Sequence, residues 1–189
     1  KSNILNCRIV RARIAMFESE YKKAEKLLLG SYDEAEKVNF KRVRALSAEF
    51  LGEIYYCSGN YEKALSYLKE GFKVTQETVP RGDIAAEIPR RIGDVYIALE
   101  EKEKAEEMLA KAETLCRHLG DKHELGCIYR AKALLAIVKK DIDLARSYFK
   151  ESIFTLRPLN ESFELATTYA TAAEEYMLWS SREGVREKL

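Results

Sequence analysis

Four side chains that can bind a metal ion lie within twelve residues of one another: Cys116, His118, His123 and Cys127. Thiolate and imidazole groups are preferred ligands of zinc. On a helix, however, Cys116 and His118 point to nearly opposite faces, and the spacing matches no familiar zinc signature. We therefore expect a buried cysteine and two histidines near a loop, with no bound metal and no cofactor.

Patterns that indicate catalysis are absent from the sequence. It contains no phosphate-cradling GxxxxGKS or GxxxxGKT loop, no GxGxxG fingerprint, no GxSxG elbow and no HExxH motif. Neighbouring carboxylates such as Glu106 and Glu107 follow the pattern of a solvated helix face, where nothing indicates the desolvation that shifts a pKa. The sequence predicts a protein that is not an enzyme.

The charges are balanced and interspersed. There are 32 Lys and Arg against 31 Asp and Glu, so no field of one sign is available to attract nucleic acid. No apolar run is long enough to cross a bilayer, and no signal peptide opens the chain. The four cysteines form no CxxC pair and no disulfide framework. These features predict a cytoplasmic protein that binds neither nucleic acid nor membrane.

Apolar residues recur at steps of three and four along almost the whole chain, as in Ile92, Val95, Tyr96 and Leu99, which is the period of an α-helix. Breakers and caps divide this pattern. We expect chain reversals at Gly30–Ser31, at 58–60, at 82–83, at 120–121 and at 158–160. Ser31 with Glu34, and Asp121 with Glu124, have the spacing of a capping box. Pro89 predicts that its helix either begins late or is kinked.

The segment GNYEKALSYLKEGF at 59–72 has echoes at 21–30, 102–111 and 143–152, so the chain repeats itself about every forty residues. Small residues form two ladders at this period, because two antiparallel helices approach closely only where a side chain is nearly absent. The ladders are Ala24, Ala64, Ala105, Ala145 and Val185, and Ala12, Gly52, Gly93, Ala133 and Ala173. Large residues at fixed offsets are expected to fill the remaining space: Tyr55, Tyr96, Tyr129, Tyr169, Tyr176, Leu28, Leu68, Leu109 and Phe149.

The motif Leu51-Gly52-x-x-Tyr55, followed by Gly59-Asn60-Tyr61-x-x-Ala64 and Leu68, resembles the tetratricopeptide repeat. The period is about six residues longer than the usual 34, which is similar to the long-helix variety found in bacterial regulators. The resemblance implies an all-α fold, a right-handed superhelical α-solenoid of about five helical hairpins in a single domain, 1–189, cut from a longer chain. The expected units are 1–31, 32–77, 83–118, 121–157 and 161–189.

In this family the first helices of the hairpins, here called the first arms, line a concave wall that holds a partner. The inward positions that the resemblance implies are Arg13, Met16, Phe17, Glu49, Glu53, Tyr56, Cys57, Glu87, Arg90, Asp94, Ile97, Cys127, Arg130, Leu134, Ile137, Ala170, Glu174 and Met177. Arg90 and Arg130 are expected to face solvent. This wall suits a peptide with apolar anchors and some Lys or Arg.

Three functions remain open at this stage. The first is a protein-interaction module that binds a peptide or partner domain, including an intramolecular one, as the regulatory segment of a larger bacterial signalling or transcription protein. The second is an array that self-associates through the apolar residues near its ends: Ile4, Leu5, Ile9, Val185 and Leu189. The third is a sensor in which a small ligand or signalling peptide changes the pitch of the superhelix.

Overall fold

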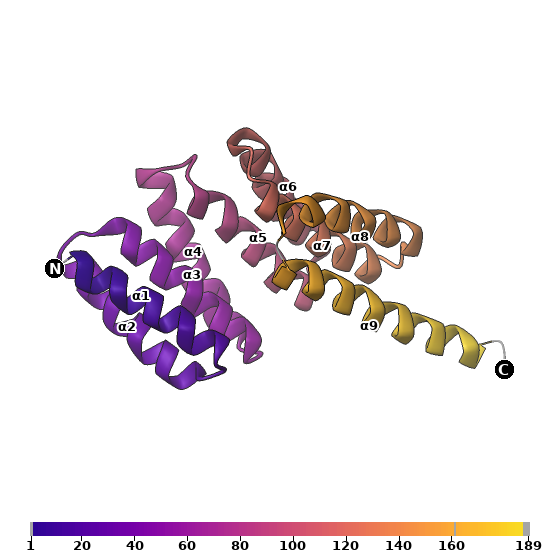
Figure 1. Ribbon diagram of the computed structural model, residues 1–189, viewed down its shortest axis with the longest axis horizontal. Helices are drawn as coiled ribbons and strands as arrows, with labels where there is room; N and C mark the ends of the chain where they lie inside the picture. Colours follow the sequence, from indigo (N-terminus) through magenta and orange to yellow (C-terminus); the bar gives the residue numbers. More distant parts are fainter. Residues whose placement is uncertain (1, 161, 187–189) are drawn as a thin grey trace. The chain divides into compact units, whose positions relative to one another are not determined.

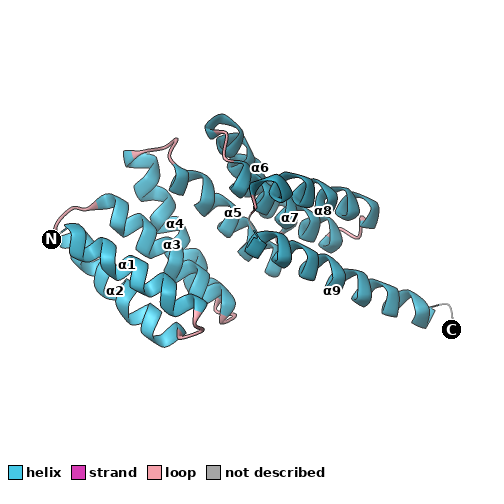
Figure 2. Ribbon diagram, viewed as in Figure 1, coloured by secondary structure: helices cyan, strands magenta, loops and turns pink. Residues whose placement is uncertain are grey.

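The computed structural model describes the backbone of residues 2–160 and 162–186, and the side chains of 3–160 and 162–176. Helices joined by short loops make up this part of the chain, and it contains no strand (Figure 1, Figure 2). The predicted all-α helical-repeat fold is confirmed. The helices are α1 Ser2–Phe17, α2 Tyr21–Lys37, α3 Lys41–Cys57, α4 Tyr61–Thr78, α5 Asp83–Ala98, α6 Lys102–Leu119, α7 Lys122–Val138, α8 Ile142–Leu156, the short 3₁₀ helix Arg157–Leu159, and α9 Ser162–Arg186.

The contacts of the chain group it into two compact units, Lys1–Leu119 with α1 to α6 and Gly120–Leu189 with α7 to α9. In the first unit, α1 pairs with α2, α3 with α4, and α5 with α6; in the second, α7 pairs with α8 and α8 contacts α9. The division falls at the reversal predicted for 120–121. That all 189 residues form a single domain stays a prediction.

The turns explain the repeat. A residue in the left-handed conformation follows a helix at twenty-residue spacing, at Ser19, Asn39 and Gly59, and again at Glu100, Gly120, Lys140 and Asn160. At the first of these turns, the Ser19 and Glu20 amides donate to the Met16 and Ala15 carbonyls. This is the Schellman arrangement, which satisfies the last carbonyls of a helix and reverses the chain sharply. Each helix with its turn therefore spans half of the forty-residue period.

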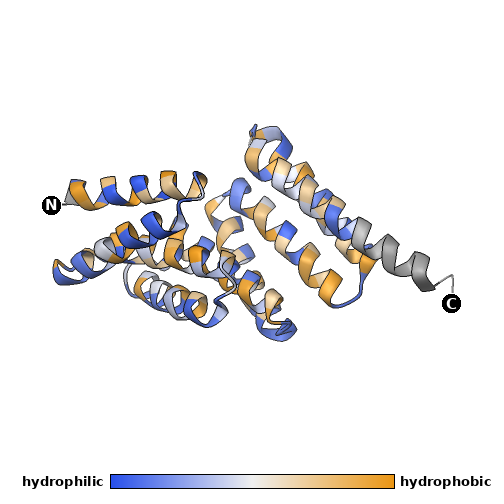
Figure 3. Cartoon of the chain, turned by 90° about the horizontal axis from the view of Figure 1, so that it is seen from below, coloured by the Kyte–Doolittle hydropathy of each residue, from blue (hydrophilic) through white to orange (hydrophobic). Residues whose placement is uncertain are grey.

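Small residues lie where paired helices cross, as the ladders predicted. Ala24, Ala64, Ala105 and Ala145 are buried, and so are Ala12, Gly52, Gly93 and Ala133 on the first arms. A Cβ placed on Gly52 would lie 2.4 Å from Cγ of Leu68 on α4. Leu28, Leu68, Leu109 and Phe149 are buried against these crossings. Hydrophobic and hydrophilic residues alternate along the helices, as an amphipathic pattern requires (Figure 3).

Several local predictions were wrong. Gly30 and Ser31 do not reverse the chain, because they lie inside α2, where the Ser31 hydroxyl donates to the Leu27 carbonyl one turn earlier. The boundary between the first two hairpins therefore falls after Lys37. The α5 helix begins at Asp83 and includes Pro89, so it does not begin late. Asp121 does cap α7, since its carboxylate accepts a hydrogen bond from the Glu124 amide.

The last repeat also differs from expectation. Residues Ser162–Arg186 form one continuous helix, so the described part of the fifth unit is a single arm rather than a hairpin. Accordingly Ala173 is exposed, and Tyr169 and Tyr176 are exposed rather than in the core, whereas Tyr55 and Tyr96 are buried as predicted. The side chains of Met177 and Val185, and the whole of Leu189, lie outside the described residues.

Candidate functional site: the polar cluster between α3 and α5

The first arms α1, α3 and α5 lie side by side within the first unit. The guanidinium of Arg13 on α1 sits 5.3 Å from the centre of the Phe50 ring on α3. Arg91 on α5 in turn forms ion pairs with Glu49 and Glu53 on α3. Arg13, Glu49 and Glu53, which the resemblance places on the wall, therefore each contact a residue of an adjacent first arm.

Arg91 joins the two carboxylates of α3. Its Nε donates to Oε1 of Glu49 at 2.8 Å, and its Nη1 lies 2.9 Å from Oε2 of Glu53. Glu49 and Glu53 are four residues apart, so one face of α3 presents both carboxylates to the same guanidinium. The planar fork of arginine suits such a bridge because its donors point in fixed directions.

Glu49 is fully buried, and its Oε2 atom has no hydrogen-bond partner among the described residues. Burial raises the pKa of this carboxyl well above its usual range, the positive charge of Arg91 lowers it, and the nearby Glu87 carboxylate raises it further. The net direction is upward because the charged form has lost its water. A buried carboxyl group with a single guanidinium partner therefore tends toward its neutral form.

Tyr56, Arg90 and Asp94 complete the cluster. Nη1 of Arg90 donates to Oδ2 of Asp94 one turn later on α5, at 2.8 Å. Burial, and then the negative charge of Asp94, raise the pKa of Tyr56 to about 12. The Tyr56 hydroxyl therefore keeps its proton at neutral pH and can donate a hydrogen bond. We call these residues the α3–α5 cluster: Glu49, Glu53, Tyr56, Arg90, Arg91 and Asp94.

The cluster combines three carboxyl groups with two guanidinium groups, and Glu53 and Asp94 are the acidic groups that reach its surface. Glu53 and Asp94 keep 33% and 21% of their side-chain surface exposed, whereas Glu49 keeps none. A cation brought to this surface would meet carboxylates that are already partly desolvated, where attraction is stronger than in bulk water. The arrangement can therefore recognise the ammonium or guanidinium group of a partner.

The other predicted site residues lie as follows. In the first unit Arg13 and Phe17 are exposed on α1, and Glu87 on α5 is half-buried. In the second unit Arg130 and Leu134 on α7 are half-buried and Glu174 on α9 is exposed. The expectation that Arg90 and Arg130 face solvent was wrong. Arg90 is only 9% exposed and donates to Asp94 on its own helix, whereas Arg130 donates to Glu164 and Thr168 of α9.

The sequence patterns did not single out two residues that form contacts in the candidate site. Arg91 was overlooked in favour of its neighbour Arg90, although it lies 42 residues after Glu49. Arg42 and Asp83, which also pair across α3 and α5, are 41 residues apart. Opposite charges separated by about one period thus signal a contact between adjacent first arms. Glu164, the partner of Arg130, was the second omission.

The four metal-capable side chains do not form one group. His123 and Cys127 lie close to Glu164, and these three are the described residues whose ligand atoms come together. Cys116 is buried on α6 and His118 is exposed at its end, as expected for a core cysteine and a histidine near a loop.

Comparison with known proteins agrees with this fold. Residues 91–118, which include most of α6, match the sequence profile of the tetratricopeptide repeat. The predicted resemblance to the tetratricopeptide repeat is confirmed, and the long-repeat variety stays a prediction. A search of curated proteins found no match.

Solved structures of similar fold come from several proteins. BtubC (BKLC) from P. vanneervenii superposes with a TM-score of 0.68 at 18% identity, over 94% of this chain and 77% of that one. A Rap protein complexed with competence and sporulation factor gives 0.63 at 14%, over 94% of this chain and 53% of that one. The TPR-like repeats of a putative kinesin light chain from P. anserina give 0.59 at 17%, over 99% and 95%. At these identities the likeness shows the fold alone, which is that of a helical repeat protein.

None of the helices in the described part of the chain combines the length and the apolar character that crossing a membrane requires.

Proposed function

We propose that the chain is a protein-interaction module that binds a peptide or a partner domain on the wall of its first arms, with the α3–α5 cluster selecting a partner that carries Lys or Arg. The observation that carries the proposal is that two carboxylates of a largely desolvated cluster, Glu53 and Asp94, keep part of their side-chain surface exposed. Such groups steer and orient a cationic partner, while neighbouring apolar contacts hold it.

Exposed side chains near the cluster supply the remaining contacts. On α1, Phe17 is 68% exposed, and the Arg13 guanidinium lies 5.3 Å from the Phe50 ring of α3, the helix that carries Glu49 and Glu53. Aromatic residues and arginine are the types that most often carry binding energy at interfaces. The Rap protein that resembles this chain was solved as a complex with competence and sporulation factor, which supports a binding role for the fold.

We propose further that this module serves as the regulatory segment of a larger bacterial signalling or transcription protein and acts in the cytoplasm. The likeness to aspartyl phosphate phosphatase F from Bacillus subtilis, of which this chain covers 48%, supports a bacterial regulatory setting. Isolation of the full-length protein and identification of the domains beside this one would test it.

The binding proposal is tested by panning a displayed peptide library against three baits. These are the parent chain, the isosteric double variant Glu53→Gln/Asp94→Asn, and the control Glu107→Gln on the second arm α6, where the glutamate is 62% exposed. We expect the parent and the control to enrich peptides with Lys or Arg beside apolar residues, and the double variant to lose that enrichment. A motif shared by all three baits, or no motif with any, would contradict the proposal.

Self-association is the second candidate, and one surface favours it. Leu5 and Ile9 were expected to promote association, but they are buried in the first hairpin. Ile4 on α1 is 57% exposed, as that expectation requires. Val10, Ile14 and Phe17 on the same helix are 57%, 51% and 68% exposed, and they share one helix face at spacings of four and three. A light-scattering mass that rises with concentration for the parent, and stays monomeric for Ile14→Lys, would support association through this face. A monomeric parent would exclude it.

A further inference from the structure

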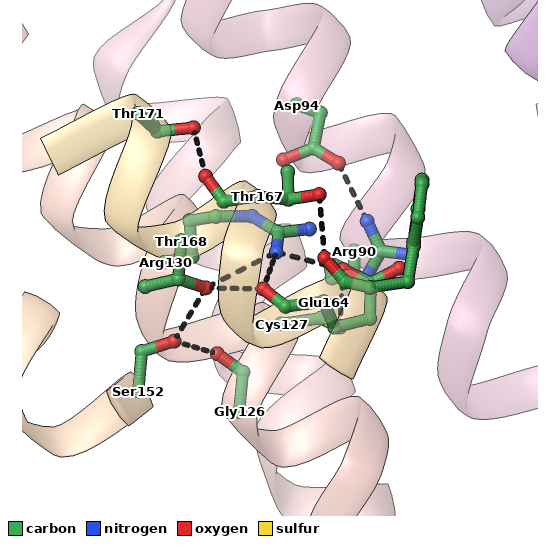
Figure 4. Close-up of polar contacts among 11 residues, drawn as sticks. Arg90, Asp94, Gly126, Cys127, Arg130, Ser152, Glu164, Thr167, Thr168 and Thr171 are labelled. Carbon is green, nitrogen blue, oxygen red and sulfur yellow. Dashed lines mark hydrogen bonds and ion pairs between the residues drawn. The ribbon is translucent and has the colours of Figure 1, made fainter. Parts of the chain in front are cut away.

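His123, Cys127 and Glu164 bring three different ligand atoms together inside the second unit. Asp121 caps α7, so His123 lies in its first turn and Cys127 lies one turn further on the same face. Glu164 comes from the first turn of α9. One ligand atom from each residue lies within 4.8 Å of the other two. Figure 4 shows Cys127 and Glu164 approaching each other, with Arg130 beside them.

The separations are those of atoms that share a metal ion. Zinc binds a cysteine sulfur at about 2.3 Å and a carboxylate oxygen at about 2.0–2.2 Å, so tetrahedral geometry places these two ligand atoms about 3.5 Å apart. Sγ of Cys127 lies 3.5 Å from Oε2 of Glu164. A ring nitrogen of His123 lies within 4.8 Å of both of these ligand atoms.

The donor set identifies the class of metal. A thiolate, an imidazole and a carboxylate suit zinc, whereas magnesium and calcium prefer oxygen ligands alone. Cys127 is 2% exposed and the other two are half-buried, so the ligands stand at the edge of the core rather than on an open surface. Three protein ligands would leave a fourth position for water or for a group from a partner.

We propose that His123, Cys127 and Glu164 bind Zn²⁺ and that the ion ties α9 to α7. Binding releases the Cys127 proton to solvent, because the thiolate is the ligand. The inference is independent of the peptide-binding proposal, since none of the three residues belongs to the α3–α5 cluster.

Arg130 positions the carboxylate and limits the affinity. Its Nη1 lies 2.7 Å from Oε2 of Glu164, and it also donates to the Glu164 carbonyl and to Thr168. These bonds hold Glu164 against α7 before any ion arrives, which lowers the ordering cost of binding. The positive charge of the Arg130 guanidinium also repels the zinc ion, which lowers the affinity of the site. The site is therefore expected to bind zinc reversibly rather than to depend on it for folding.

A cobalt titration tests the site directly, because Co²⁺ substitutes for Zn²⁺ and a cobalt–thiolate bond produces a charge-transfer absorption band. The parent for this experiment carries Cys7→Ser and Cys57→Ser, which remove the two exposed thiols. Zinc affinity is then measured by competition with a chromophoric chelator. We expect the band in this parent, its displacement by zinc, and a melting temperature that rises with zinc concentration.

Matched variants locate the ligands. Cys127→Ser should abolish the band, and His123→Ala and Glu164→Gln should each weaken zinc binding by at least about tenfold, the effect that loss of even an outer partner can have. Cys116→Ser and His118→Ala are the controls and should bind as the parent does. Circular dichroism verifies folding of each variant, and Glu164→Gln decides if Cys127→Ser does not fold. Absence of the band in the parent, or undiminished binding by Glu164→Gln, would overturn the proposal.

Discussion

Arg91 on α5 donates a 2.8 Å hydrogen bond to Glu49 on α3, a carboxylate that has no exposed surface. The pair joins two first arms that are 42 residues apart in sequence. It shows that a charged pair can hold adjacent first arms together.

Replacing Arg91 with Met should destabilise the first unit by about 1–3 kcal/mol, because it leaves the buried Glu49 carboxyl group without its hydrogen-bond donor. Urea unfolding followed by circular dichroism measures the change. The control Arg42→Met removes an arginine whose ion pair with Asp83 is more than half exposed, and it should cost no more than about 1 kcal/mol. If the two substitutions lowered the free energy of unfolding equally, the burial of Glu49 would not explain the contribution of its ion pair to stability.

The raised pKa of Glu49 predicts a pH dependence. The folded protein holds this proton more tightly than the unfolded chain, so the contribution of Glu49 to stability is fully present below its unfolded pKa of about 4.3. It is lost as the pH rises through the folded pKa. Glu49→Gln should therefore gain stability relative to the parent as the pH increases through that window. A difference in free energy of unfolding that stays constant with pH, or shrinks, would contradict this.

Two glycines within helices should respond in opposite directions to alanine. Gly52→Ala should destabilise by about 1–3 kcal/mol, because the new Cβ would meet the buried Leu68 side chain at 2.4 Å and the α3–α4 crossing would have to open. Gly30→Ala, inside α2, meets nothing within 4 Å and should stabilise by about 0.5–1 kcal/mol. Thermal melts of both variants check the pair, and a gain at Gly52 would mean that the crossing is looser than described.

The cap of α7 gives a further comparison. Asp121 accepts a 3.0 Å hydrogen bond from the Glu124 amide, so Asp121→Ala should cost about 1 kcal/mol. The matched control is Asp143→Ala, in the first turn of α8, where the aspartate side chain is 97% exposed. This substitution should change the free energy of unfolding by less than about 0.5 kcal/mol. Chemical unfolding monitored by circular dichroism compares the two, and an unaffected Asp121 variant would argue against the cap.

Prediction of the fold succeeded because it depended on local periodicities that packing reinforces. The small residues Ala64 and Gly52 recur where helices cross, and Gly59 occupies a left-handed turn that favours glycine. Gly30 and Ser31 misled the interpretation, because both residue types also occur inside helices when a serine can bond to the preceding turn. A turn signal that occurs once, such as Gly30 with Ser31, is a weaker basis for prediction than a residue type that recurs at the same position in every repeat.

The sequence by itself determined the helical hairpins, their forty-residue period and the small residues at their crossings, since these follow from backbone geometry and side-chain volume within each repeat. Only the tertiary structure decided which charges meet. Arg91 with Glu49, Arg130 with Glu164, and the grouping of His123 and Cys127 with Glu164 all join separate helices. A helical pattern places a side chain on a face, whereas pairing depends on how far one arm is shifted along the next, and that shift is set by packing of the whole unit.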